Sequence, residues 1–189
     1  MAAGSRKKFA LDLNDIIAFP DAAHMPVFPP TERESWILLM EITANESITR
    51  PVYAVRDTTR TQFVVALYTP NPQRDARQFE IGHTLCITSA RPHQFLDGQT
   101  GFRIEDSSSI QVLPVSLARL WEINAGLRAR SDGGDLLKCN VCDSPSSMGC
   151  GACKSRYCSR ECQRSDWPQH KRACVALKAL HRWNRTDWG

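Results

Sequence analysis

Short hydrophobic runs, separated by turn residues, cover the chain up to about residue 115 and predict β-strands. Residues 35–43 (SWILLMEIT) are apolar and partly β-branched. Residues 61–69 (TQFVVALYT) are apolar almost throughout, which is typical of a strand covered on both faces. Residues 51–56 alternate between two faces. Three further strands are predicted at residues 84–89, 101–105 and 110–115.

Turn and helix signals divide these runs. Residues 57–60 and the Asp97-Gly98 pair predict hairpin turns, residues 71–79 a short helix, and residues 117–127 a helix that closes the domain. The pattern therefore predicts a small all-β domain with short helices, residues 11–128, and a Gly-Asp linker at residues 129–138. The strand order, with a short helix before the fourth strand, resembles an OB-fold, which is a small barrel. Another small β-barrel or a sandwich is the alternative.

The chemistry of the chain is concentrated after the linker. Seven of the eight cysteines lie between residues 139 and 174, together with His170. They form four close pairs, and eight Cys and His ligands are what two tetrahedral zinc ions require. The pairs are Cys139 with Cys142, Cys150 with Cys153, Cys158 with Cys162, and His170 with Cys174.

Disulfides are the other chemistry that so many cysteines could indicate. The N-terminal residues show no apolar signal-peptide segment, no run of about 18 apolar residues predicts a membrane span, and seven cysteines in the cluster is an odd number. We therefore expect two structural zinc ions in a reducing compartment, the nucleus or the cytoplasm.

The residues between the ligands add a family resemblance. Residues 157–174 read YCS-x2-CQ-x2-DW-x2-H-x3-C and follow two CxxC pairs, and this stretch resembles a MYND zinc finger, at residues 139–174. The resemblance implies interleaved ligand sets, whereas spacing alone leaves sequential pairing open. By resemblance, one zinc is held by Cys139, Cys142, Cys158 and Cys162, and the other by Cys150, Cys153, His170 and Cys174.

The resemblance also implies a recognition surface. In that family the finger binds short proline-containing peptides, and the matching positions here are Gln163 and Trp167, which lie one turn apart on a helix. The alternative is that Trp167 packs against the zinc core and that Gln163 is merely solvated. Residues 175–189 are predicted to be a C-terminal helix followed by a frayed tail from Asn184, with His181 on the surface.

An OB-like barrel suggests a second function, the binding of single-stranded nucleic acid, and the net charge of the barrel region tests this hypothesis. Residues 1–124 hold 12 Lys and Arg against 14 Asp and Glu, so the barrel region lacks the basic excess typical of such proteins. Clustering of its arginines on one face would favour nucleic acid, and scattering would favour protein. The arginines in question are Arg56, Arg60, Arg91 and Arg103.

Signals for catalysis are weak. We find no phosphate-binding glycine loop, GxSxG or HExxH motif and no resemblance to a SET methyltransferase core, and four protein ligands per zinc leave no open position for a reactive water. The sequence thus predicts no enzyme, no small-molecule substrate and no membrane partner. It predicts an intracellular protein-interaction adaptor, and the family resemblance implies a context of transcriptional regulation.

Overall fold

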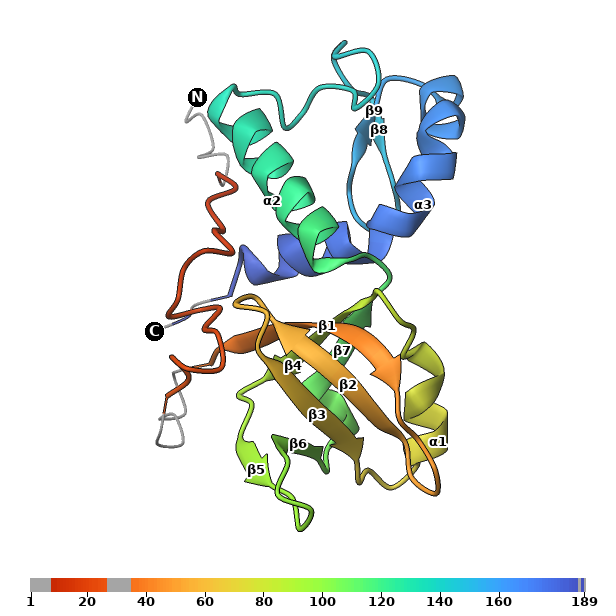
Figure 1. Cartoon of the computed structure of the whole chain (residues 1–189). Helices are drawn as coiled ribbons and strands as arrows, with labels where there is room; N and C mark the ends of the chain where they lie inside the picture. The colour runs from red at the N-terminus through yellow and green to blue at the C-terminus, as the bar shows by residue number, and fades with distance from the viewer. Residues whose placement is uncertain (1–7, 27–34, 187, 189) are drawn as a thin grey trace. The chain divides into compact units, whose positions relative to one another are not determined.

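The computed structural model describes residues 8–26, 35–186 and 188 (Figure 1). The chain divides into two compact units. The barrel unit spans Leu13–Leu120, and the finger unit combines the chain up to Asp12 with Trp121–Thr186. None of the described helices is long and apolar enough to cross a membrane.

A seven-stranded sheet forms the barrel unit. Each predicted strand is present within two residues of its expected bounds, and the additional β5 begins with a proline, which removes a backbone donor at this edge position. The strands are β1 (Ile37–Asn45), β2 (Val52–Asp57), β3 (Gln62–Leu67), β4 (Thr84–Thr88), β5 (Pro92–Gln94), β6 (Thr100–Ile104) and β7 (Ile110–Leu113).

The strand order is β5-β6-β3-β2-β1-β4-β7. All neighbours are antiparallel except β3 and β6, which run parallel. Strands β6 and β7 follow each other in the sequence but lie near opposite ends of the strand order, β6 beside β3 and β7 beside β4. Because only residues 105–109 connect them, the sheet must curl until its two ends come close together. Residues 105–109 span the gap between β6 and β7 without pairing, so the barrel is OB-like but is not closed by a continuous ladder.

A single glycine permits the parallel pairing of β3 with β6. Gly101 lies opposite Val64, and a Cβ atom added at Gly101 would lie 1.9 Å from the Val64 carbonyl oxygen. Only glycine allows the two backbones to approach so closely.

Apolar side chains from both halves of the sheet fill the barrel. The predicted alternation of β2 is confirmed, because Tyr53 and Val55 are buried while their neighbours are less covered. The expectation for β3 is partly wrong, since Phe63 and Val64 are only half-buried and the strand is covered fully from Val65 onward.

Two short helical turns, α1 (Pro72–Asp75) and η1 (Ala76–Gln78), occupy the predicted helical stretch between β3 and β4. The turn that follows brings Phe79 onto the ring of Tyr53, with centroids 4.6 Å apart. A third short helical turn, η2 (Ser107–Ser109), lies between β6 and β7.

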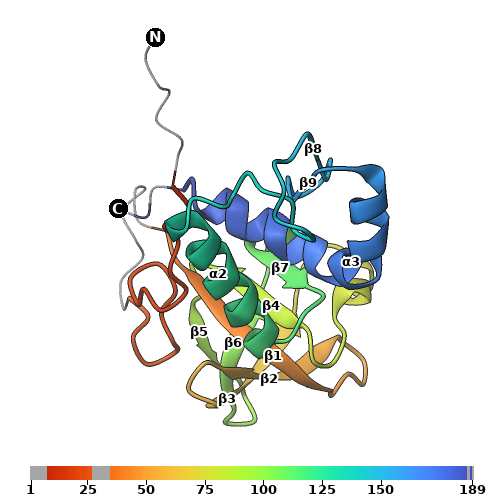
Figure 2. The same cartoon turned by 90° about the horizontal axis from the view of Figure 1, so that it is seen from above.

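The finger unit contains a second helix, α3 (Arg160–Trp183), a two-stranded sheet and helix α2 (Leu117–Asp132) from Trp121 onward, since the first turn of α2 belongs to the barrel unit. Helix α2 extends five residues beyond its predicted end, so the first four residues of the predicted linker are helical. Strands β8 (Met148–Gly149) and β9 (Arg156–Tyr157) pair antiparallel, and β9 contacts helix α3 (Figures 1 and 2).

Helix α3 runs without interruption from the finger to Trp183, so the predicted C-terminal helix is the second half of a longer element. It contains Pro168, which cannot donate to the carbonyl one turn earlier, and Figure 1 shows the helix changing direction between its two halves.

The N-terminal segment belongs to the finger unit, although the sequence assigns it to the barrel from residue 11. The Asn184 side-chain oxygen accepts hydrogen bonds from the backbone N–H groups of Ala10 (2.7 Å) and Leu11 (2.9 Å). The Phe9 N–H donates to the hydroxyl of Ser131 on α2 at 2.9 Å, and Phe9 is 2 % exposed. Asn184 is therefore an ordered anchor, which corrects the prediction that the frayed tail starts there.

His181 is also placed differently from the expectation of a surface histidine. Its ring meets Phe9 edge-on, with centroids 5.6 Å apart, and burial, followed by the charge of Arg185, lowers its pKa from the usual 6.5.

Candidate metal centre and interaction surface

The structure gathers the eight predicted zinc ligands into two groups of four, in the interleaved sets that the MYND resemblance implies. In each group the ligand atoms lie within 4.8 Å of one another. The first group is Cys139, Cys142, Cys158 and Cys162, and the second is Cys150, Cys153, His170 and Cys174.

The distances between ligand atoms test the fit of zinc. Tetrahedral zinc with Zn–S bonds of about 2.3 Å places its sulfurs about 3.8 Å apart. In the first group, the Cys158 sulfur lies 3.5 Å from those of Cys142 and Cys162, which are 4.0 Å from each other. In the second group the Cys150 and Cys174 sulfurs are 3.8 Å apart. The two groups fit two structural zinc ions.

Both CxxC pairs use the same turn. In the first, the N–H of Asp143 donates to the Cys139 carbonyl at 3.1 Å, and in the second the N–H of Lys154 donates to the Cys150 carbonyl at 3.0 Å. Asp143 and Lys154, each directly after the second cysteine, have positive φ angles of 56° and 67°. The two turns therefore present their cysteines in equivalent ways.

The remaining ligand pairs, each with three residues between its members, differ in how they are positioned. His170 and Cys174 lie one turn apart within α3, as the spacing predicts. Cys158 precedes the helix, since Ser159 is the N-cap and its hydroxyl accepts from the N–H of Cys162. The expectation that a three-residue gap means one helical turn is therefore wrong for Cys158 and Cys162.

The thiols of the first group cannot all ionise without a cation. Burial raises the pKa of Cys139, but backbone N–H groups directed at its sulfur, that of Val141 first, outweigh burial and bring it to about 6. The Cys158 thiol donates to the sulfurs of Cys142 and Cys162, and these hydrogen bonds hold its proton in place and raise its pKa to about 12. The Cys139 thiolate thus forms readily, and its negative charge disfavours ionisation of the other thiols in the group. A bound zinc ion removes this repulsion.

The second group repeats this asymmetry. Burial raises the pKa of Cys150, yet backbone N–H groups, that of Cys153 first, bring it to about 6. Burial, followed by the charge of Cys153, raises the pKa of Cys174 to about 12. Three thiols and an imidazole are ligands that zinc prefers, and the charge of the ion allows the thiols to ionise together.

An aspartate lies behind the histidine ligand. The buried Tyr157 hydroxyl donates to the Asp166 carboxylate at 2.6 Å, and the same oxygen lies 3.8 Å from Nδ1 of His170. The other ring nitrogen, Nε2, lies 3.5 Å from the Cys153 sulfur and thus faces the metal site. Asp166 is therefore a charged outer neighbour of a metal ligand, placed behind its ring at a distance longer than a hydrogen bond.

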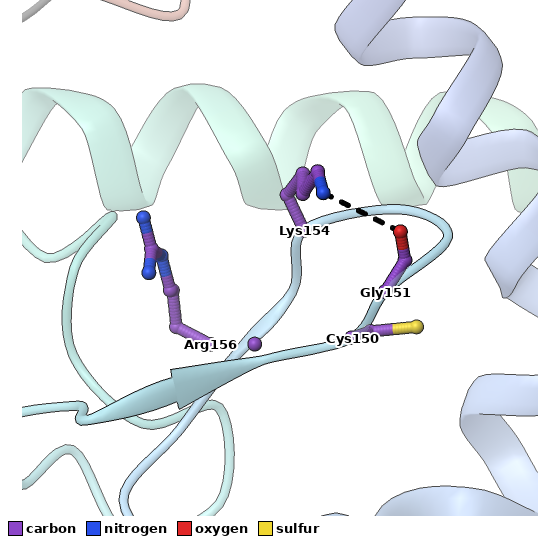
Figure 3. A pocket seen from close by; sticks show the side chains of 5 residues that line it. Cys150, Gly151, Lys154 and Arg156 are labelled. Carbon is purple, nitrogen blue, oxygen red and sulfur yellow. Dashed lines mark hydrogen bonds between the residues drawn. The ribbon is translucent and has the colours of Figure 1, made fainter.

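Basic side chains lie on the outer side of the second CxxC turn. A hollow there is lined by Gly149, Cys150, Gly151, Lys154 and Arg156 (Figure 3). Lys154 Nζ donates to the Gly151 carbonyl at 3.4 Å, and the Cys150 sulfur points away from the Arg156 side chain. The ligand atom and the cations therefore occupy different sides of this turn.

The two predicted recognition residues lie on one face of α3. Gln163 and Trp167 line a hollow of about 250 Å³ together with Arg160 and Arg164. Trp167 is 50 % exposed, and its ring lies 6.0 Å from that of His170, centroid to centroid. Trp167 therefore combines a contact to a zinc ligand with a free surface and is not part of the buried core.

The barrel unit has a larger hollow between the β1–β2 and β5–β6 loops, with a volume of about 430 Å³. The guanidinium carbons of Arg50 and Arg103 lie 3.5 and 4.1 Å from the centre of the Tyr68 ring. Of the four arginines singled out in the sequence, only Arg103 reaches this ring. Arg56 pairs with Glu41, and Arg60 lies in the β2–β3 turn at the other end of the hairpin.

Sequence reasoning found the ligands but missed several residues around them. Tyr157 and Asp166 stood in the matched motif without an assigned role, and their nine-residue separation gave no sign that they touch. Arg160 and Arg164 carried a usable signal, because they fall one turn apart beside Gln163 and Trp167 on the same predicted helix.

Comparison with known proteins agrees with this geometry. The family model "MYND finger" matches residues 139–174. The chain is 46 % identical over 50 residues to Dauer abnormal formation protein 25 of Caenorhabditis elegans, a match covering 26 % of this chain and 13 % of that protein. It is 44 % identical over 48 residues to the zinc finger MYND domain-containing protein 10 homolog of Drosophila melanogaster, covering 25 % and 11 % of the two chains. The chain thus spans only a small part of these relatives.

A mitochondrial single-stranded DNA binding protein from S. cerevisiae is a structural neighbour, with a TM-score of 0.31 and 12 % identity, covering 44 % of this chain and 97 % of that one. The barrel is OB-like in its own strand order and in the parallel pairing of β3 with β6. The ligand geometry and the family match agree on the other unit: residues 139–174 form a MYND-type zinc finger, a zinc-binding protein-interaction domain.

Proposed function

We propose that this chain is an adaptor whose finger binds short proline-containing segments of partner proteins through Gln163 and Trp167. The observation that carries the proposal is the half-exposed Trp167 above the zinc ligand His170, in a hollow that also includes Gln163. A tryptophan held in place by a metal site offers a large apolar surface at little further cost in side-chain entropy, as interface anchors do.

The chemistry of a proline-containing segment suits this hollow. Proline has no backbone N–H, so such a segment presents ring surface and carbonyl oxygens. The Trp167 ring can contact the proline ring, and the Gln163 amide can donate to a carbonyl. The extended form of the segment exists before binding, which reduces the entropy lost on association.

We propose recognition without catalysis. The ligand sets favour this proposal, because four protein ligands complete the coordination of each zinc and leave no position for a reactive water. The adaptor role would place the chain in transcriptional regulation, a context that comes from the family resemblance.

The test is binding of a fluorescent peptide with a central Pro-Pro to the zinc-loaded chain. We expect Trp167→Ala to weaken binding at least tenfold, since anchor residues carry about 2 kcal/mol or more. Val141→Ala is the matched control, because Val141 is a similarly exposed apolar residue of the finger at 47 %. Equal binding by wild type and a folded, zinc-loaded Trp167→Ala variant would overturn the proposal.

A second candidate function is the binding of single-stranded nucleic acid by the barrel. The stack of Arg50, Tyr68 and Arg103 favours it, because the two guanidiniums can attract phosphate and their planes can stack on a base, while the Tyr68 ring holds them in place. The carboxylates of Glu46 and Asp97 line the same hollow and oppose it.

Titration of random single-stranded DNA and RNA at two salt concentrations separates the candidates. Binding that weakens steeply with salt and is lost in Tyr68→Ala would support the nucleic-acid function. Binding that Tyr68→Ala leaves unchanged would exclude this hollow as its site.

A further inference from the structure

Four residues make one continuous stripe on the first half of α3. Arg160, Gln163, Arg164 and Trp167 follow the i, i+3, i+4, i+7 spacing of a single helical face, and all four line the same hollow. The stripe therefore joins the recognition residues to two guanidinium groups.

The two guanidiniums of this stripe are exposed and available to a ligand. Within the described part of the chain, no ion pair involves Arg160 or Arg164, whose side chains are exposed. The adjacent acidic residue, Glu161, is held at the helix start by its own backbone N–H and the Ser159 hydroxyl, which lower its pKa first, and the charges of Arg164 and Arg160 lower it further. Glu161 therefore offsets part of the positive charge without forming an ion pair with either arginine. Asp166 accepts the hydroxyl of Tyr157.

We propose that the finger selects partner segments in which acidic residues stand next to the proline. This inference rests on the proposed function and specifies its ligand. A hollow with an apolar ring, an amide and two cations complements a segment with a proline ring, carbonyl oxygens and carboxylates.

The spacing of the two arginines matches an extended ligand. Four residues along an α-helix rise about 6 Å. Two residues of a polyproline II segment rise about 6.2 Å, so acidic residues two positions apart are spaced like the two guanidiniums. Two exposed ion pairs strengthen binding by between about twofold and thirtyfold at low salt, and the gain falls as salt is added.

The experiment compares three fluorescent peptides in which a central proline stands between two identical residues, Asp, Asn or Lys, so that the flanking residues are two positions apart. Each is titrated with the zinc-loaded full chain at low and at physiological salt. We expect the Asp peptide to bind more tightly than the Asn peptide within that range, and the Lys peptide to bind more weakly. Trp167→Ala should weaken all three.

Two double variants with the same charge change locate the effect. Arg160→Gln with Arg164→Gln removes the cations of the hollow, and Lys171→Gln with Arg172→Gln removes two exposed cations elsewhere on α3. We expect the preference for Asp over Asn to disappear in the first variant and to persist in the second. The Asn peptide should bind both equally well.

Each outcome decides between the two claims. Trp167-dependent binding of the Asn peptide without a preference for Asp would overturn the acidic selectivity and leave the proposed function standing. A preference that survives the loss of Arg160 and Arg164 would show general electrostatic attraction and also overturn it. No binding of any peptide would refute the proposed function, and the inference with it.

Discussion

Replacing Asp166 by Asn tests how the second zinc site is supported. The carboxylate receives the Tyr157 hydroxyl at 2.6 Å and lies 3.8 Å from Nδ1 of His170. The amide can still accept from Tyr157 but carries no charge to orient and polarise the His170 ring. Loss of such an outer partner lowers metal affinity by about 10-fold to 100-fold. This equals about 1.4–2.8 kcal/mol of zinc-binding free energy.

In the assay, a chromogenic chelator competes with the protein for zinc. The measured quantity is the number of zinc ions that each chain retains at each chelator concentration. We expect Asp166→Asn to lose one ion at a lower chelator concentration than wild type and to keep the other. Asp143→Asn is the matched control, since Asp143 is an exposed carboxylate beside the first site and pairs with Arg130.

An unchanged competition curve for Asp166→Asn would refute the reasoning, because it would mean that the His170 ring is fixed without the carboxylate. Simultaneous release of both ions would contradict the assignment of Asp166 to one site only.

Two further predictions concern stability. Gly101→Ala should lower the free energy of unfolding by about 2 kcal/mol or more in chemical denaturation, because the added Cβ meets the Val64 backbone. The control is Gly126→Ala, on α2 with open space around it, which should leave the free energy of unfolding unchanged or raise it. His181 has a lowered pKa in the folded state, so the unfolded chain binds a proton more readily and stability falls as pH falls through about 6.5. The drop in melting temperature from pH 7.5 to 6.0 should be smaller in His181→Gln than in wild type, and an equal drop would contradict the placement against Phe9.

The zinc ligands were predictable because metal chemistry depends on residue type and spacing. The interleaved pairing was not predictable from spacing, since sequential pairing leaves equally short loops. It follows from three-dimensional contacts, such as the 3.8 Å between the Cys150 and Cys174 sulfurs, which are 24 residues apart.

The strands were predictable from their hydrophobic runs, but three features of the fold were not. Strand β5 is three residues long and starts with Pro92, so its local preferences do not favour a strand. The parallel contact at Gly101 depends on backbone approach, which residue patterns do not record. The attachment of Phe9 to the finger unit depends on hydrogen bonds to Ser131 and Asn184, far away in the chain.

The most direct test of the adaptor function is an NMR titration of isotope-labelled, zinc-loaded chain with the peptide that carries a central Asp-Pro-Asp. We predict shifts of the Trp167 indole N–H, the Gln163 side-chain amide and the backbone amides of residues 160–167, with Tyr68 and its loops unchanged. Shifts centred on Tyr68, or none at saturating peptide, would contradict recognition by the α3 hollow.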